Sequence, residues 1–202
     1  TLFRSVYRRS ARYHQIYCAV MVGKYDEVRQ LAEAFLADFP DAAVARDVRF
    51  FQAKAACETE RYAAAVSPLQ ELVGEQSLDW EYWADAVDLL AKALGELGRD
   101  DDRAAVLLEA AEKGGAWAPE WLLHAAEAER SSGNRAAAIR ILESVLKKYP
   151  DSRDEAVAAT LYLAELYSIE QDFERAQQLV RDLLRGEETT AIQGRLHYLL
   201  GY

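Results

Sequence analysis

The chain has few of the residues on which several common protein classes depend. Its 202 residues include two cysteines, too few for a disulfide scaffold or a zinc site built from cysteines. Four prolines and ten glycines argue against disorder and against a turn-rich all-β fold. No apolar run reaches the roughly 18 residues that a membrane-spanning helix needs. These absences favour a folded chain with no direct membrane span.

Basic charge is also scarce. The sequence has 24 lysines and arginines against 34 aspartates and glutamates, which gives a net charge of -10. Because nucleic acids carry a dense negative charge, an acidic chain is a poor candidate for binding them. We therefore expect no nucleic-acid partner.

Residues that would carry out catalysis or bind a metal are few and scattered. There is no glycine-rich phosphate loop, and Gly114-Gly115 is typical of a turn. His14 and Cys18 share a helical face, but no third ligand lies near them in the sequence. Cys57 occupies a comparable place further along, and a Cys18–Cys57 disulfide stays open for an oxidising compartment. We expect no enzyme activity, no cofactor and no metal site.

What the sequence does contain is helical periodicity along nearly its whole length. Apolar or small residues at 157, 161, 164 and 167 have offsets of 0, 4, 7 and 10, which define one helical face. The stretch 176–184 has the same spacing, and a polar break with one aromatic residue, 171–174, separates the two. Two amphipathic helices joined by a short polar break form a helix hairpin.

This hairpin recurs along the chain. Each copy has a glycine or polar residue, usually an aromatic two residues later, and then a small residue that begins the second helix. The small residues recur with a mean period of about 37. They are Val28, Ala65, Ala104, Ala138 and Ala176, and the turns before them begin at Gly23, Glu60, Gly98, Gly133 and Gln171.

The pattern resembles the tetratricopeptide repeat. The resemblance is best in the fourth and fifth copies, where Gly133, Ala138 and Pro150, then Phe173 and Ala176, match the family's spacing. It implies an all-α fold, a right-handed superhelical solenoid of stacked hairpins, with about five repeats and a partial sixth. The implied repeats of this single solenoid are 4–40, 43–77, 80–115, 118–150, 154–187 and the partial 190–202.

The resemblance also predicts how the hairpins pack. Helices approach closely only where side chains are small, which places alanines at the crossing points. Pro68 lies inside a second helix and predicts a kinked but continuous helix there, with a later helix start as the alternative. The four tryptophans at 80, 83, 117 and 121 are expected mainly in the core. The crossing-point alanines are Ala53, Ala65, Ala126, Ala138, Ala164 and Ala176.

The N-terminal stretch differs from the rest in charge. Residues 1–24 contain five basic residues and no acidic one. Arg4, Arg8 and Arg12 share one helical stripe. We favour pairing of this stripe with the acidic second helix of a preceding repeat, and an acidic partner or a phosphate surface are the alternatives.

In the tetratricopeptide family the first helix of each repeat lines a concave groove that binds partners. When the family's groove positions are transferred to this sequence, the N-terminal end of the groove is aromatic. The middle of the groove is mixed and mostly acidic, with Asp47, Asp85 and Glu120 among the acidic residues. A protein or peptide segment with basic and apolar residues would fit such a groove. The alternative is a solvated face without a ligand. The predicted groove residues are Tyr13, Tyr17, Phe50, Lys54, Asp88, Lys92, Leu123, Glu127, Arg130, Leu161 and Glu165.

The function predicted from this resemblance is a protein-interaction scaffold in a multiprotein assembly. The stretches after Pro40 and Pro150 are similar to repeats of bacterial envelope proteins, which favours a periplasmic or envelope location over a cytoplasmic one. Because the chain begins at Thr1 and its helical pattern is cut off at the other end, we expect a piece of a longer protein. The alternative function is therefore a docking or sensor arm of an enzyme, export component or regulator whose active domain lies elsewhere. Apolar faces at the ends of an array also predict self-association.

Overall fold

The computed structural model describes residues 2–75 and 79–186, and within those ranges it contains ten α-helices and no strand. The chain divides into two compact units, Thr1–Arg99 (unit 1) and Asp100–Tyr202 (unit 2). Unit 1 contains α1 (Leu2–Met21), α2 (Tyr25–Asp38), α3 (Ala45–Glu58), α4 (Tyr62–Gly74) and α5 (Trp83–Glu96). Unit 2 contains α6 (Asp100–Glu112), α7 (Ala118–Ser131), α8 (Arg135–Lys148), α9 (Arg153–Ile169) and α10 (Phe173–Gly186).

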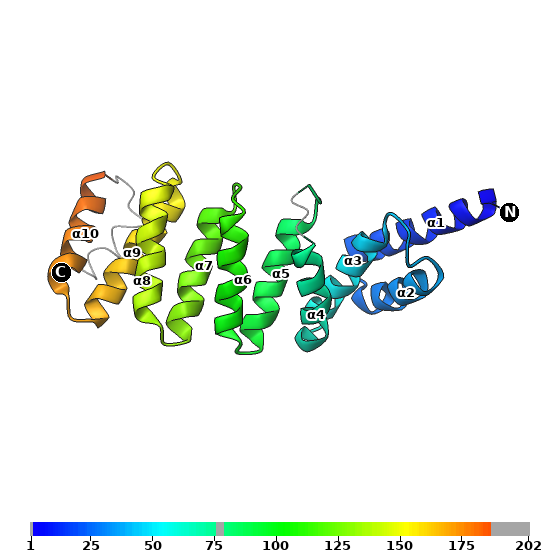
Figure 1. Cartoon of the computed structure of the whole chain (residues 1–202), viewed down its shortest axis with the longest axis horizontal. Helices are drawn as coiled ribbons and strands as arrows, with labels where there is room; N and C mark the ends of the chain where they lie inside the picture. The colour runs from blue at the N-terminus through cyan, green and yellow to red at the C-terminus, as the bar shows by residue number, and fades with distance from the viewer. Residues whose placement is uncertain (1, 76–78, 187–202) are drawn as a thin grey trace. The chain divides into compact units, whose positions relative to one another are not determined.

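Within each unit the helices stack in chain order. In unit 1, α2 packs on α3 and α4 on α5, and in unit 2 each of α6 to α9 packs on the next helix (Figure 1). The odd-numbered helices, called first helices below, also contact one another, α1 with α3 and α3 with α5 in unit 1, and α7 with α9 in unit 2. The even-numbered helices are called second helices. This arrangement confirms the predicted all-α fold of stacked helix hairpins.

The turns inside the hairpins share one backbone geometry. The residue that begins each predicted turn has a positive φ, from 58° at Glu60 to 88° at Gly133. At Gly133 the backbone N–H bonds to Arg130 O at 3.0 Å, and the next N–H bonds to Glu129 O at 2.7 Å. These two bonds satisfy carbonyls at the helix end in the manner of a Schellman cap. The residue that recurs at the start of each turn in the sequence is therefore the left-handed residue at which the first helix of the hairpin ends.

The core of each unit contains the small residues expected there. All six predicted crossing-point alanines are buried, with exposed fractions between 0% and 4%. Helix α4 runs unbroken through Pro68, which confirms that the helix is continuous, while the kink stays a prediction. Trp83 and Trp121 are buried, but Trp117 is 52% exposed, so the tryptophans are only partly a core feature.

Two predictions concern the ends of the chain. Arg8 and Arg12 pair with Asp38 at the end of α2, the second helix of their own hairpin, and pairing with a preceding repeat stays a prediction. The Arg8 to Asp38 distance is 3.6 Å. The predicted partial repeat 190–202 lies outside the described residues, as does the side chain of Arg4.

Candidate interaction surfaces

The first helices of unit 1 present a cluster of aromatic side chains. Phe51 on α3 is at its centre, with its ring centroid 6.3 Å from that of Tyr13, 6.1 Å from Tyr17 and 5.3 Å from Tyr82. Tyr17 is 39% exposed, whereas Phe51 is 2% exposed. Edge-on and tilted ring pairs at these distances are favourable contacts. The cluster therefore has a buried base and an accessible rim of tyrosines.

Asp47 organises the polar side of this cluster. Its carboxylate accepts a hydrogen bond from Trp80 Nε1 at 2.8 Å and one from the Tyr13 hydroxyl at 3.3 Å. The guanidinium of Arg46 lies 4.2 Å from the centroid of the Trp80 ring and forms an ion pair with Glu75 at 3.0 Å. One aspartate thus joins α1, α3 and the segment before α5.

Burial and nearby carboxylates change the pKa values of tyrosines in this cluster. Burial raises the pKa of Tyr13 to about 12, and the charge of Asp47 adds to this shift. Burial likewise raises the pKa of Tyr82, together with the carboxylates Glu81, Asp47 and Asp85. We call this region the aromatic–acidic surface. It consists of Tyr13, Tyr17, Phe51, Trp80 and Tyr82 with Asp47, Glu81 and Asp85.

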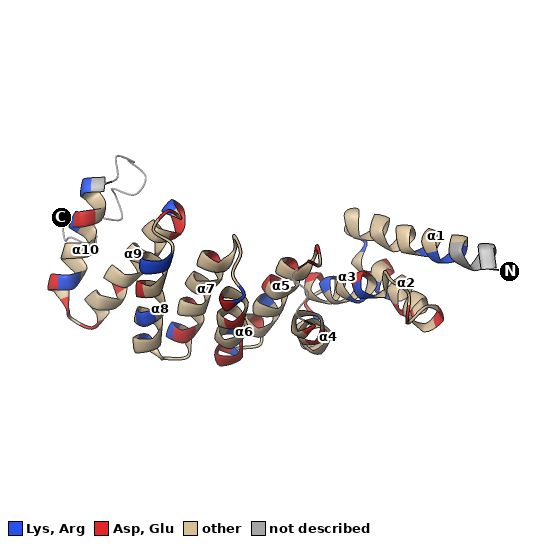
Figure 2. Cartoon of the chain, turned by 45° about the horizontal axis from the view of Figure 1, so that its top comes forward, with Lys and Arg blue, Asp and Glu red and all other residues tan. Residues whose placement is uncertain are grey.

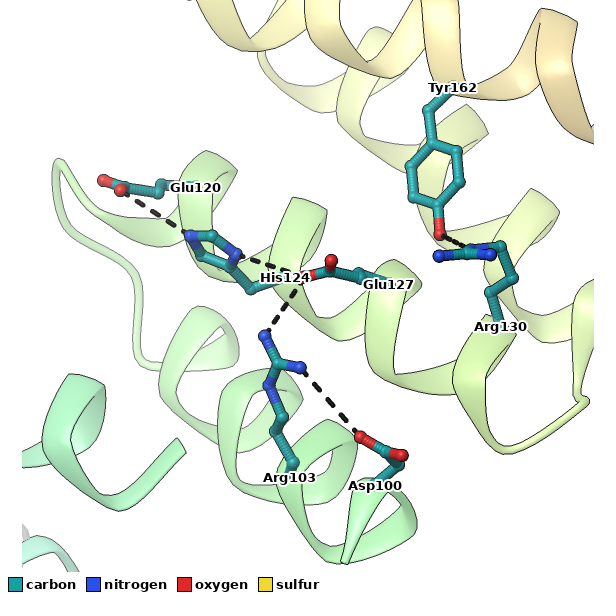
Figure 3. A network of polar contacts seen from close by, with 7 residues as sticks. All are labelled: Asp100, Arg103, Glu120, His124, Glu127, Arg130 and Tyr162. Carbon is teal, nitrogen blue, oxygen red and sulfur yellow. Dashed lines mark hydrogen bonds and ion pairs between the residues drawn. The ribbon is translucent and has the colours of Figure 1, made fainter. Parts of the chain in front are cut away.

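The first helices of unit 2 carry charges and few aromatics. His124 on α7 lies between two carboxylates, with Nε2 3.8 Å from Glu120 and Nδ1 3.9 Å from Glu127 (Figure 3). Glu127 also pairs with Arg103 of α6 at 3.1 Å, and Arg103 is 4.0 Å from Asp100. These polar contacts all lie within unit 2.

A second contact joins α7 to α9. Arg130 donates a hydrogen bond from Nε to the hydroxyl of Tyr162 at 2.6 Å (Figure 3). Burial raises the pKa of Tyr162, and the hydrogen bond from Arg130 opposes that shift. This contact ties the two first helices of unit 2 together on the same side as His124.

The structure places the eleven predicted groove residues at very different depths. Tyr13, Tyr17, Glu127 and Arg130 take part in the contacts above. Phe50 is 1% exposed and stacks beneath Tyr82 at 5.0 Å, so it belongs to the core. Leu161 is also buried, so these two do not line an open groove. The other five are all exposed or part-exposed, and they are Lys54, Asp88, Lys92, Leu123 and Glu165.

Sequence reasoning missed Phe51 and Tyr82. Phe50 and Phe51 lie three and four residues after Asp47, so each is within about 60° of both Asp47 and Lys54 around the helix, and periodicity does not distinguish them. Tyr82 lies before α5 begins at Trp83, in a turn where helical periodicity gives no information.

No metal site is apparent in the described part of the chain. It holds no group of three or more His, Cys, Asp or Glu side chains suited to a metal ion. Cys18 and Cys57 are both free thiols, Cys18 exposed and Cys57 buried, and burial raises the pKa of Cys57 to about 11. Among the described helices, none combines the length and apolar character required to cross a bilayer.

Residues 122–152 match the sequence model of the tetratricopeptide repeat family. The protein carries a tetratricopeptide repeat. The matched stretch covers most of α7, the turn at Gly133 and all of α8. Repeats of this family generally mediate protein–protein interaction and typically have no catalytic role. No curated protein matches the sequence significantly.

Solved structures, including two described as tetratricopeptide or tetratricopeptide-like repeat proteins, resemble the fold. The repeats of a Podosopora anserina protein described as a kinesin light chain match 88% of this chain and 93% of theirs, with TM-score 0.63 and 16% identity. BtubC from P. vanneervenii matches with TM-score 0.58 and 16% identity over 95% of this chain and 85% of its own. A tetratricopeptide repeat protein of Thermus thermophilus matches with TM-score 0.52 and 17% identity over 96% of this chain and 100% of its own. At these identities the likeness establishes the fold alone.

Proposed function

We propose that this protein is a non-catalytic interaction scaffold that binds a partner segment across the first helices of unit 1. The observation that carries the proposal is the aromatic–acidic surface. Exposed aromatic groups are strong anchors in protein interfaces, and carboxylates beside them select a partner of opposite charge.

The chemistry of this surface specifies the partner. The charges that raise the pKa of Tyr82 are those of Glu81, Asp47 and Asp85, so a cation is favoured beside the accessible tyrosines. A lysine or arginine also interacts favourably with the face of an aromatic ring. The proposed partner is therefore a protein segment with basic and apolar residues, and Phe50 contributes to its binding only by supporting the surface from below.

The test is capture of a partner from a native lysate with cross-linking and mass spectrometry. Wild-type protein is compared with Glu81→Lys/Asp85→Lys, which reverses two charges of the surface. The matched control is Glu33→Lys/Glu71→Lys, which makes the same charge change at exposed positions of the second helices α2 and α4. These four side chains are all exposed, so the variants are expected to fold.

The expected result is a partner that cross-links to the first helices of unit 1. Its capture falls roughly tenfold with Glu81→Lys/Asp85→Lys and stays near wild type with the control. Equal capture by all three proteins, or cross-links confined to second helices, would contradict the proposal.

A further inference from the structure

Unit 2 contains an open groove on the side of α7 opposite to His124. Leu122 and Glu129 line the groove, whereas Glu120, His124 and Glu127 form the polar network. Leu122 and His124 are two residues apart, which rotates their side chains by about 200° around the helix. The groove is thus a separate surface from the polar network of α7, and it lies in unit 2, whereas the proposed function uses residues of unit 1.

The base of this groove is apolar. It has a volume of about 320 Å³ and lies between α6 and α8, with α7 as its floor. Leu122 is 7% exposed at the bottom, and Leu108 of α6 and Ile141 of α8 are part-exposed on the sides. An apolar trough between two helices suits the side chains of a third helix.

The rim of the groove is charged, with the two signs separated. Glu112 comes from α6 and Glu129 from α7, whereas Arg140 and Lys148 both come from α8. Figure 2 shows the acidic character of α6 and the basic segments of α8. None of these four side chains has a hydrogen bond or ion pair with another described residue.

In the next groove of unit 2, the polar side chains of the rim have partners within the unit. It has a volume of about 280 Å³ and lies between α8 and α10, above α9. There Glu143 accepts a hydrogen bond from Tyr167 at 2.8 Å, and Arg175 lies 4.6 Å from the Tyr167 ring. Arg175 also bonds to Asp172 at 2.6 Å. The polar rim of that groove is occupied by its own unit.

We propose that the groove between α6 and α8 docks an amphipathic helix of a partner protein, with acidic residues along the flank facing α8 and basic residues along the flank facing α6 and α7. An apolar stripe of the partner fills the space above Leu122. Four rim charges without partners among the described residues then gain partners of opposite sign. Charge separation also favours one direction of the bound helix, because the reversed helix places like charges together.

The test uses designed helical peptides of about 18 residues with one common leucine stripe. One peptide carries glutamates on one flank and lysines on the other, a second carries glutamates on both flanks, and a third carries lysines on both. Each is titrated into the full chain, with chemical shifts mapping the site. The rim variant is Arg140→Glu/Lys148→Glu, and its control is Arg135→Glu/Lys147→Glu, which changes exposed residues of the same helix outside the groove.

For wild type, the mixed peptide is expected to bind roughly tenfold more tightly than either single-sign peptide. The rim variant loses roughly tenfold for the mixed peptide and gains affinity for the lysine peptide, because its rim is then wholly acidic. The control keeps the wild-type order of affinities.

A further variant keeps the test decisive if Arg140→Glu/Lys148→Glu does not fold. Glu112→Lys/Glu129→Lys makes the rim wholly basic, so it is expected to prefer the glutamate peptide. Thermal melts monitor folding of every variant. The proposal is overturned if no peptide binds up to about 1 mM, if the shifts lie outside α6 to α8, or if rim and control variants bind alike.

Discussion

The two units place different chemistry at equivalent positions of their first helices. Ala53 of α3 and Ala126 of α7 are both buried crossing-point alanines, so Phe51 corresponds to His124 and Asp47 to Glu120. In unit 1 the Phe51 side chain is 2% exposed and gathers four aromatic neighbours. In unit 2 the His124 side chain is 49% exposed between two carboxylates.

The difference shows how one backbone pattern serves two purposes. In unit 1 the large rings bury area against one another, so this face contributes to stability as well as to the proposed binding. In unit 2 the same positions hold exposed polar side chains, and their local contacts contribute little to stability because solvent screens them. Helix packing is preserved in both units because the alanines, not the face residues, set the approach of the helices.

The largest expected effect is at the equivalent positions Phe51 and His124, where the two units differ most in burial. Phe51→Ala removes a buried ring and is expected to lower the free energy of unfolding of unit 1 by about 3–5 kcal/mol. His124→Ala removes a half-exposed ring and is expected to change unit 2 by less than about 0.5 kcal/mol. Hydrogen exchange measured by mass spectrometry reads α3 and α7 separately. Similar losses of protection in both helices would refute the distinction.

A smaller effect is expected at the hairpin turns. The same left-handed position holds Glu60 in unit 1 and Gly133 in unit 2, with φ of 58° and 88°. Gly133→Glu places a side chain where the backbone disfavours one and is expected to destabilise unit 2 by about 1–2 kcal/mol. Glu60→Gly relieves that strain and is expected to stabilise unit 1 by up to about 1 kcal/mol, after the added chain entropy of glycine.

Urea unfolding of each turn variant gives the measurement, with the midpoint read by helical circular dichroism. The midpoint is expected to rise for Glu60→Gly and fall for Gly133→Glu. Shifts of the same sign for both variants would show that backbone strain is not what distinguishes the two turns.

The smallest effect concerns the pH dependence of unit 1. The folded chain holds the pKa of Tyr13 at about 12, above its ordinary value of 10.0. The folded state therefore binds more protons than the unfolded state between these values, so stability is full below about pH 10 and falls as pH rises toward 12. The loss is expected to stay below about 1 kcal/mol, because Tyr13 is part-exposed and its interactions are screened.

Tyrosinate absorbance followed during alkaline titration checks this shift. Tyr13→Phe is expected to remove the step near pH 12, and Asp47→Asn to move it toward lower pH. Tyr7→Phe, at an exposed position of the same helix, is the control. An unchanged titration in Tyr13→Phe would mean that another group produces the step.

The sequence was sufficient for the repeat and for much of its packing. Gly133, Ala138 and Pro150 mark a helix stop, a crossing point and a helix end, and each depends on local geometry or on side-chain size. Such features can be predicted from the sequence without knowing which helix packs against them. The buried alanines and the continuous helix through Pro68 were therefore predictable.

Only the tertiary structure decided which side chains meet. Tyr82 lies in a turn before α5, and its contact with Phe51 depends on how α5 stacks on α3. Phe50 and Phe51 are adjacent in sequence, and both are buried, but Phe51 alone contacts the tyrosines of α1. The free rim of the groove between α6 and α8 likewise follows from helix spacing. Periodicity assigns a residue to a face of its own helix, whereas long-range packing decides what that face touches.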